Sequence, residues 1–325
     1  MKILLTGGSG FIGSHIRRRL SNVELVNLDI KQPQINDNPK HLFVKGDIRN
    51  NEDVKKAMSG CDVVIHLAAI WDDFSVDDSF YFDTNVNGTK VLIENAKELN
   101  IERFINYSSV SVYGEYDFAC KEDETPFAPV NAYGKSKLEA EKLFEEWIKQ
   151  DSDVSVIHLR PSVVFGENNY GNIYRLVNQI ASGLYFNIKR GNALKSISYV
   201  ENLVEATVYL MDGMKVGIEA YNYADEPHMN AIEISNVIAK ALGKNNPITI
   251  PYWMAYTMAL PFDALITLTK RNLPVSTMRV KKYCTQTLNS CDKLKSTGFS
   301  PMVDSREGLI RMVGWYIRNK AEASK

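Results

Sequence analysis

The sequence has 325 residues, of which 45% are apolar and 24% are charged, and its formal net charge is -1. This is the composition of a globular protein with one large or two modest domains, and it provides no basic field of the kind that binds nucleic acid. Four scattered cysteines without a C-x-x-C pair argue against a zinc site or a disulfide framework and fit a reducing compartment. The start, "MKILLTGGSGFIG", is broken by glycines too early for a signal peptide, and no apolar run of about 18 residues predicts a spanning helix.

Short apolar runs alternate with helical patterns in the first half of the chain. The predicted strands are 2–7, 23–29, 41–47, 62–69, 103–109 and 154–161, and the helical stretches between them are 13–21, 51–59, 80–99 and 134–149. Continuous apolar strands separated by helices predict a parallel sheet that is covered on both faces. Right-handed crossovers then make an α/β, doubly wound (Rossmann) sheet.

Beyond Pro161 this alternation becomes irregular. Helical patterns at 172–184, 202–213 and 231–242 are separated by Gly, Asn and Pro. We therefore predict a doubly wound, nucleotide-binding domain over 1–161. Residues 162–325 are predicted to form mainly a smaller substrate-binding lobe, with segments that return to the sheet, so that the two parts interleave.

The stretch "TGGSGFIGSH" places Gly7, Gly10 and Gly13 between the first strand and the first helix. Glycines there permit a tight turn and let a pyrophosphate approach the backbone at the helix N-terminus. Asp29 ends the second strand, where a carboxylate can accept hydrogen bonds from both ribose hydroxyls and repels a 2′-phosphate. The pattern therefore favours NAD over NADP, although Lys31 lies close. Asp47 ends the third strand, from which it could reach the adenine.

The stretch "NAYGKSKLEAEKL" places Tyr133 and Lys137 four residues apart at the start of a predicted helix, and therefore on one face of it. A free phenol has a pKa near ~10, and a close ammonium favours its phenolate form. Tyr133 is thus a candidate general base for a sugar or alcohol hydroxyl. Ser109, in "YSSVSVYG" at the carboxyl end of a strand, can hydrogen-bond the same hydroxyl.

Together, "TGGSGFIG", "HLAA", "SSVSVYG" and "YGKSK" resemble the extended short-chain dehydrogenase/reductase family of nucleotide-sugar epimerases and dehydratases. The resemblance covers nearly the whole chain, and it implies that Ser109, Tyr133 and Lys137 are the catalytic triad. The NAD contacts that it implies are Gly7, Gly10, Phe11, Ile12, Gly13, Asp29, Asp47, Ile48, Leu67, Ala68, Ala69, Ser108, Tyr133, Lys137 and Pro161.

The residues after Ser109 bear on the reaction. Dehydratases of this family have an Asp-Glu pair there, because removal of water needs an additional acid and base. Here Val110 and Ser111 follow, so dehydration is not expected. A 4-epimerase, which regenerates its NAD in each cycle, and a reductase of a 4-keto sugar or a hydroxysteroid-like alcohol both remain. A third alternative, a non-catalytic dinucleotide sensor, disagrees with the intact triad.

Further stretches, "GNIYRLVNQIASG", "KSISYVENLVEA", "YNYADEP" and "VSTMRVKKYC", are similar to bacterial 4-epimerases that act on N-acetylglucosamine linked through diphosphate to undecaprenol. This similarity implies a role in cell-surface polysaccharide (O-antigen) biosynthesis and diphosphate contacts at Asn172, Lys195 and Arg279. "LRPSVVFG" departs from the R-Y-F-N pattern of UDP-galactose epimerases, which puts a UDP carrier in doubt.

The resemblance also implies a homodimer formed through two helices beside the active site, and a cytoplasmic enzyme. Residues 245–262 carry no charged side chain, and the stretch up to 271 ends in Lys270 and Arg271. Prolines at 247, 251 and 261 argue against a regular spanning helix. Two interpretations stay open: residues 245–271 form the core of the small lobe, or they make peripheral contact with the inner membrane face.

Overall fold

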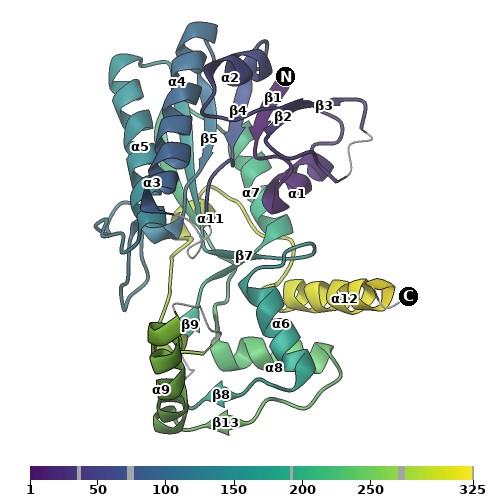
Figure 1. Cartoon of the computed structure of the whole chain (residues 1–325). Helices are drawn as coiled ribbons and strands as arrows, with labels where there is room; N and C mark the ends of the chain where they lie inside the picture. The colour runs from purple at the N-terminus through teal and green to yellow at the C-terminus, as the bar shows by residue number, and fades with distance from the viewer. Residues whose placement is uncertain (35–37, 72–76, 191–192, 270–274, 324–325) are drawn as a thin grey trace.

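The computed structural model describes residues 1–34, 38–71, 77–190, 193–269 and 275–323. A seven-stranded sheet in the order β11-β6-β5-β4-β1-β2-β3 lies in the upper part of the molecule (Figure 1), and all neighbouring strands are parallel. Its strands are β1 (Lys2–Thr6), β2 (Glu24–Asp29), β3 (His41–Lys45), β4 (Val63–His66), β5 (Arg103–Tyr107), β6 (Ser155–Pro161) and β11 (Gly217–Tyr223). The predicted doubly wound α/β fold is confirmed.

Both faces of the sheet are apolar because its strands are apolar at successive positions. In β1, Ile3 and Leu5 face one core while Leu4 faces the other, and all three are fully buried. The core that contains Ile3 is covered by α1 (Phe11–Arg19) and α7 (Val200–Asp212). The opposite core is covered by α2 (Asn51–Met58), α4 (Gly88–Leu99) and α5 (Ala132–Gln150).

The strand order reverses between β1 and β4. From β1 the chain continues to β2 and β3 on one side, and from β4 to β5, β6 and β11 on the other. In an open parallel sheet the crevice at such a reversal, outside the carboxyl ends of the strands, is where ligands bind. Gly7 follows β1 and Leu67 follows β4, so the predicted cofactor residues lie at this crevice.

The predicted helix over 80–99 is divided into three parts. It consists of α3 (Asp78–Tyr81), the π-helical turn η1 (Phe82–Asn87) and α4. Asn85 in the π-helical turn is buried, accepts a hydrogen bond from Ile70 N at 2.8 Å and donates one to Ser136 Oγ of α5 at 2.9 Å. Widened helical turns of this kind are frequent at functional sites.

Most of the remainder of the chain forms the lower part of the molecule in Figure 1, whereas α7 and β11 return to the sheet. The boundary at residue 161 stays a prediction. The chain after residue 161 also contains short strand pairs that sequence periodicity does not reveal. They are β7 (Val163–Phe165) with β10 (Ile197–Tyr199), β8 (Asn187–Ile188) with β13 (Thr249–Ile250), and β9 (Leu194–Lys195) with β12 (Met229–Asn230). Besides α7, the described helices after residue 161 are α6 (Asn172–Ser182), α8 (Ala231–Ala241), α9 (Tyr252–Thr269), α10 (Thr277–Cys284), α11 (Asp292–Ser296), which packs against β11, and α12 (Ser305–Ala323).

Within the proline-containing stretch, Tyr252–Thr269 form a helix, α9, that the sequence did not indicate. Two of its prolines precede α9, whereas Pro261 lies inside it. α9 lies on the outside of the lower part (Figure 1). Within the described ranges, no helix has the length and apolar character needed to span a bilayer.

Candidate active site

The glycine loop joins β1 to α1 with almost no free space around it. Gly7 has a φ of +71°, and a Cβ there would lie 2.8 Å from Ala68 N. A Cβ on Gly13 would lie 2.5 Å from both Gly7 O and the Cα of Gly8. The predicted glycine positions are therefore required by close contacts between backbone segments. They bring the loop after β1 against the Leu67-Ala68-Ala69 loop after β4.

The first turn of α1 has no side-chain cap. Its N-cap residue, Gly10, has no polar side chain, so the amides of Phe11 and Ile12 can bind an anion. Asp29 ends β2 beside the loop, and its carboxylate accepts hydrogen bonds from Ser9 N at 3.0 Å and Lys31 N at 2.9 Å. This cradle fits the pyrophosphate of a dinucleotide, with an acidic group positioned for a ribose.

Asp47 is paired with an arginine, which its position in the sequence did not indicate. Its carboxylate forms an ion pair with Arg49 at 2.6 Å, and Arg49 also reaches Asp83 of the π-helical turn at 2.5 Å. The hydrogen bond from Arg49 lowers the pKa of Asp47. Ile48 next to it is buried beneath Gly88, where a Cβ would lie 2.4 Å from Ile48 Cδ1. Asp47 could therefore accept a bond from adenine only while sharing its carboxylate with Arg49.

Lys137 of α5 is buried and donates a hydrogen bond from Nζ to Tyr107 O at 2.7 Å. Tyr107 ends β5, two residues before Ser109, so this bond ties the helix to the strand that carries the serine. Burial lowers the pKa of Lys137 to about 8. The ammonium thus lies in a poorly solvated site, where its charge acts strongly on neighbouring groups.

Ser109 and Tyr133 belong to two segments that are in close contact with each other. Ser109 caps the short helix η2 (Val110–Val112) and accepts a hydrogen bond from Ser111 N at 3.1 Å. Asn131 caps α5 by accepting from Gly134 N at 2.8 Å, which fixes Tyr133 in the first helical turn. A Cβ on Gly134 would lie only 2.5 Å from Ser111 O. The start of α5 is thereby held against the turn that contains Ser109.

Two further predicted cofactor positions lie at the carboxyl ends of the neighbouring strands β5 and β6. Ser108 is buried, and its amide donates to Leu159 O of β6 at 2.8 Å. Pro161 ends β6 and is paired in register with Tyr223 of β11. The ends of β5 and β6 are thus adjacent, as expected for neighbouring parallel strands.

The three predicted diphosphate contacts come from separate elements. Asn172 begins α6, Lys195 ends β9, and Arg279 lies exposed on α10. Lys195 Nζ donates to Lys282 O at 3.1 Å and also to Thr285 O, at the end of α10. Lys195 therefore anchors the helix that carries Arg279, a structural role that its place in the sequence did not indicate.

Buried polar groups behind the site were missed by the sequence analysis. His66 of β4 is bonded to Thr6 Oγ1 at 2.7 Å and Thr89 Oγ1 at 3.1 Å. Glu141 of α5 pairs with Arg160 of β6. The signal available was polar residues inside apolar strand runs, "VVIHLAA" and "VIHLRP", but such runs do not reveal the partner.

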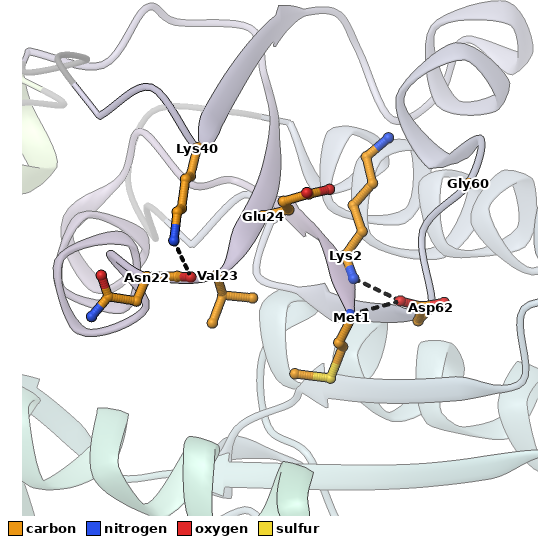
Figure 2. A pocket seen from close by; sticks show the side chains of 8 residues that line it. All are labelled: Met1, Lys2, Asn22, Val23, Glu24, Lys40, Gly60 and Asp62. Atoms are coloured by element: carbon orange, nitrogen blue, oxygen red, sulfur yellow. Dashed lines mark hydrogen bonds and ion pairs between the residues drawn. The ribbon is translucent and has the colours of Figure 1, made fainter.

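Two other features of the described structure lie outside this site. A hollow of about 600 Å³ lies at the amino ends of β1 and β2, between Lys2, Glu24 and Lys40 (Figure 2), at the edge of the sheet opposite to the glycine loop. In the described ranges, no group of three or more His, Cys, Asp or Glu side chains could hold a metal ion.

Comparison with known proteins agrees with this geometry. Residues 3–224 match the NAD dependent epimerase/dehydratase family. The chain belongs to this family. NAD is its cofactor, as the glycine loop predicted, because the family is NAD dependent. The UDP-glucuronic acid 4-epimerase of Bacillus cereus, which is similar in structure, is in complex with NAD.

Several relatives of this family member cover almost its full length. An N-acetyl-alpha-D-glucosaminyl-diphospho-ditrans,octacis-undecaprenol 4-epimerase of Escherichia coli O157:H7 is 34% identical over 95% of this chain and 93% of its own. A mouse sterol-4-alpha-carboxylate 3-dehydrogenase is 28% identical over 96% and 90%. The Bacillus cereus structure superposes with a TM-score of 0.79 at 25% identity, over 98% of this chain and 99% of its own.

Asp29 leads to a prediction about cofactor choice. We expect NAD to bind about 100-fold more tightly than NADP, because placing like charges together costs several kcal/mol. Isothermal titration with both cofactors tests this. Asp29→Ala combined with Ile30→Arg should narrow the difference, whereas Glu24→Ala, at the other end of β2, should leave it unchanged. Equal affinities in the wild type would contradict the assignment and favour a reductase.

Proposed function

We propose that this NAD-dependent sugar 4-epimerase acts on N-acetylglucosamine or N-acetylgalactosamine linked through diphosphate to a polyprenol, in cell-surface polysaccharide biosynthesis. The observation that carries the proposal is the 34% identity to the undecaprenol-linked epimerase, which extends over nearly all of both chains. The small lobe is included in that match, and this is the part from which we expect the substrate contacts. Asn172, Lys195 and Arg279 are proposed to contact the diphosphate.

In the proposed mechanism Tyr133 removes the proton of the C4 hydroxyl while Ser109 orients that hydroxyl by a hydrogen bond. NAD, held by the glycine loop and Asp29, would supply a two-electron acceptor and donor for the hydrogen on C4, which is what inversion at that carbon needs. Lys137 stabilises the Tyr133 phenolate through its positive charge. Tyr133 then gives the proton back to the C4 oxygen. All atoms return to the sugar, so no net oxidation occurs.

The proposed substrate is tested by incubating the enzyme with polyprenyl-diphosphate-linked and UDP-linked N-acetylglucosamine and determining the C4 configuration of each product. We expect conversion of the lipid-linked sugar without added cofactor. The alternative function, a 4-keto-sugar reductase, requires one NAD(P)H for each product molecule. Conversion of the UDP-sugar alone would contradict the polyprenyl carrier but retain the epimerase.

We also infer a homodimer through α4 and α5, the two helices beside the proposed site. Each helix carries an exposed ion pair within itself, Lys90 with Glu94 at 3.9 Å in α4 and Lys142 with Glu139 at 2.7 Å in α5, which leaves no unpaired charge at these positions to repel a second copy. Phe80 and Phe82, which precede α4, are also exposed and could pack against a second copy. Light scattering after size-exclusion chromatography tests this, and a monomeric mass would contradict it.

We further propose a cytoplasmic enzyme that contacts the inner membrane face through residues 245–271, of which 270 and 271 lie outside the described residues. The support is exposure: Trp253 is 65% exposed, Met258 51% and Leu268 82%, and the buried residues of α9 are the small Ala255 and Ala259. A stretch that formed the core of the lobe would bury these large side chains. Aromatic and aliphatic residues on an exposed helix are typical of interfacial binding.

Charge supports the same surface. Asp263 is the one charged residue of α9, and it accepts hydrogen bonds from Thr277 N at 3.1 Å and Thr277 Oγ1 at 2.5 Å, which joins α9 to α10. The Asp263 carboxylate is thus bonded to α10. α10 adds Arg279, Lys281 and Lys282, all exposed. Cations beside an apolar helix favour anionic lipid.

We predict that the protein cosediments with anionic liposomes and that Trp253→Glu or Met258→Glu weakens this binding severalfold without unfolding it. Turnover of lipid-linked sugar should fall in parallel. Met302→Glu is the matched control, because Met302 is 74% exposed outside α9 and α10. Absence of binding by the wild type, together with a sharp loss of thermal stability in both variants, would show that α9 packs as core.

A further inference from the structure

A third residue extends the line of Tyr133 and Lys137 along α5. Glu141 lies one further helical turn on, so the three side chains share one face of the helix. Lys137 is 5% exposed and Glu141 is fully buried. A carboxylate that is buried here stays ionised only if a cation or hydrogen-bond donors offset its lost hydration.

Arg160 of β6 provides the partner. Its guanidinium binds Glu141 through two hydrogen bonds, Nε to Oε1 at 2.9 Å and Nη2 to Oε2 at 2.6 Å. The third nitrogen donates to Tyr113 OH at 2.8 Å, and the guanidinium lies 4.9 Å from the ring centre of Phe127. Arg160 is therefore fixed from three sides, and it fixes Glu141 in turn.

The other polar groups that face these residues are uncharged near neutral pH. His66 of β4 faces Lys137, and burial lowers its pKa to about 3. His158 of β6 faces Glu141, and burial lowers its pKa to about 4. Ser108 adds only a hydroxyl. Among the described groups facing this line, the charges at neutral pH are thus two cations, Lys137 and Arg160, and one anion, Glu141, which Arg160 binds and whose charge acts on Lys137.

These charges affect whether Lys137 is protonated. Burial lowers the pKa of Lys137 to about 8, and the charge of Glu141 opposes this decrease. Without the carboxylate, the effect of burial on Lys137 would be unopposed, and Arg160 would be left as an uncompensated cation in the same poorly solvated interior. The ammonium can release its proton, whereas the guanidinium cannot. Loss of that proton would leave the Tyr133 phenolate without its counter-charge.

We propose that Glu141, held by Arg160, is a positioning residue that keeps the Lys137 ammonium charged and so maintains Tyr133 as a base. Glu141 acts through Lys137 and contacts neither sugar nor cofactor. This inference depends on the proposed role of Tyr133 but not on the identity of the sugar carrier. Its test can therefore be made without any sugar.

The test follows the ionisation of Tyr133 by tyrosinate absorbance in the NAD-bound enzyme, as the difference between each protein and its Tyr133→Phe counterpart. In Glu141→Gln we expect the midpoint to move up by about one pH unit, because Lys137 then faces an uncompensated cation. In Glu141→Gln with Arg160→Gln the midpoint should return close to that of the wild type, because the two lost charges cancel. Arg160→Gln alone should not raise it.

A structural role alone gives a different pattern. It would lower thermal stability in all three variants and leave every midpoint unchanged, and that outcome would overturn the proposal. If Glu141→Gln does not fold, a rise of the midpoint in Arg160→Gln overturns the proposal equally. Where lipid-linked sugar is converted, the acid limb of the pH–rate profile should move with the midpoint. Failure of that sugar assay with the expected midpoints would reject the substrate and leave the role of Glu141 intact.

Discussion

Replacing Tyr133 with phenylalanine is expected to remove nearly all turnover while the fold and NAD binding are retained. The ring can still occupy its place in the first turn of α5, but the proposed base is lost, and a general acid–base group usually contributes ~10²–10⁴ in rate. The measurement is the rate of C4 inversion in an enzyme whose bound NAD has been quantified. Activity within threefold of wild type would reject Tyr133 as the base.

Two comparisons sharpen this experiment. Ser109→Ala should reduce turnover less, because it removes an orienting hydrogen bond and leaves the base. Tyr170→Phe serves as the matched control, since Tyr170 is exposed and its hydroxyl accepts a bond from Asn319 Nδ2 at 3.1 Å, outside the proposed site. Its turnover should equal that of the wild type.

Gly13→Ala should weaken NAD binding by about 10- to 100-fold. The added methyl would lie 2.5 Å from Gly7 O and from the Cα of Gly8, so the pyrophosphate loop must open. Overpacking of this kind costs about 1–3 kcal/mol. NAD affinity by titration of the stripped enzyme is the measurement, with thermal unfolding of the same sample as a check on the fold.

A second helical glycine provides the control for this prediction. A Cβ on Gly314 of α12 would meet Arg318 Nη1 at an ordinary 3.5 Å. Gly314→Ala should therefore leave NAD affinity unchanged and stabilise the helix by roughly 0.5–1 kcal/mol. Wild-type NAD affinity in Gly13→Ala would show that the loop does not enclose the pyrophosphate as we propose.

The surface of α9 and the line of charges on α5 have different consequences for the enzyme. In our proposal, exposed Trp253 and Leu268 bind the membrane and so affect access to a lipid-linked substrate. Glu141 and Arg160 are proposed to affect the ionisation of the base and so the rate of proton transfer. Because the two groups lie on different elements, their variants should affect lipid binding and pH dependence separately.

Much of the architecture could be predicted from the sequence because its causes are local. Strand and helix periodicity in the first half located β1 to β6 to within about two residues at most ends. The four-residue spacing of Tyr133 and Lys137 places them on one helix face whatever surrounds the helix. The glycine loop could also be predicted, since a tight turn between a strand and a helix requires glycine at defined positions.

Only the tertiary structure decided which partners these residues have at distant positions in the sequence. The bond of Lys137 to Tyr107, the pair of Glu141 with Arg160 and the anchoring of α10 by Lys195 each join different elements. The exposure of α9 was equally undetermined, because an apolar helix has the same composition in a core or on a surface. Local patterns specify which face a side chain occupies, and only packing specifies what lies opposite to it.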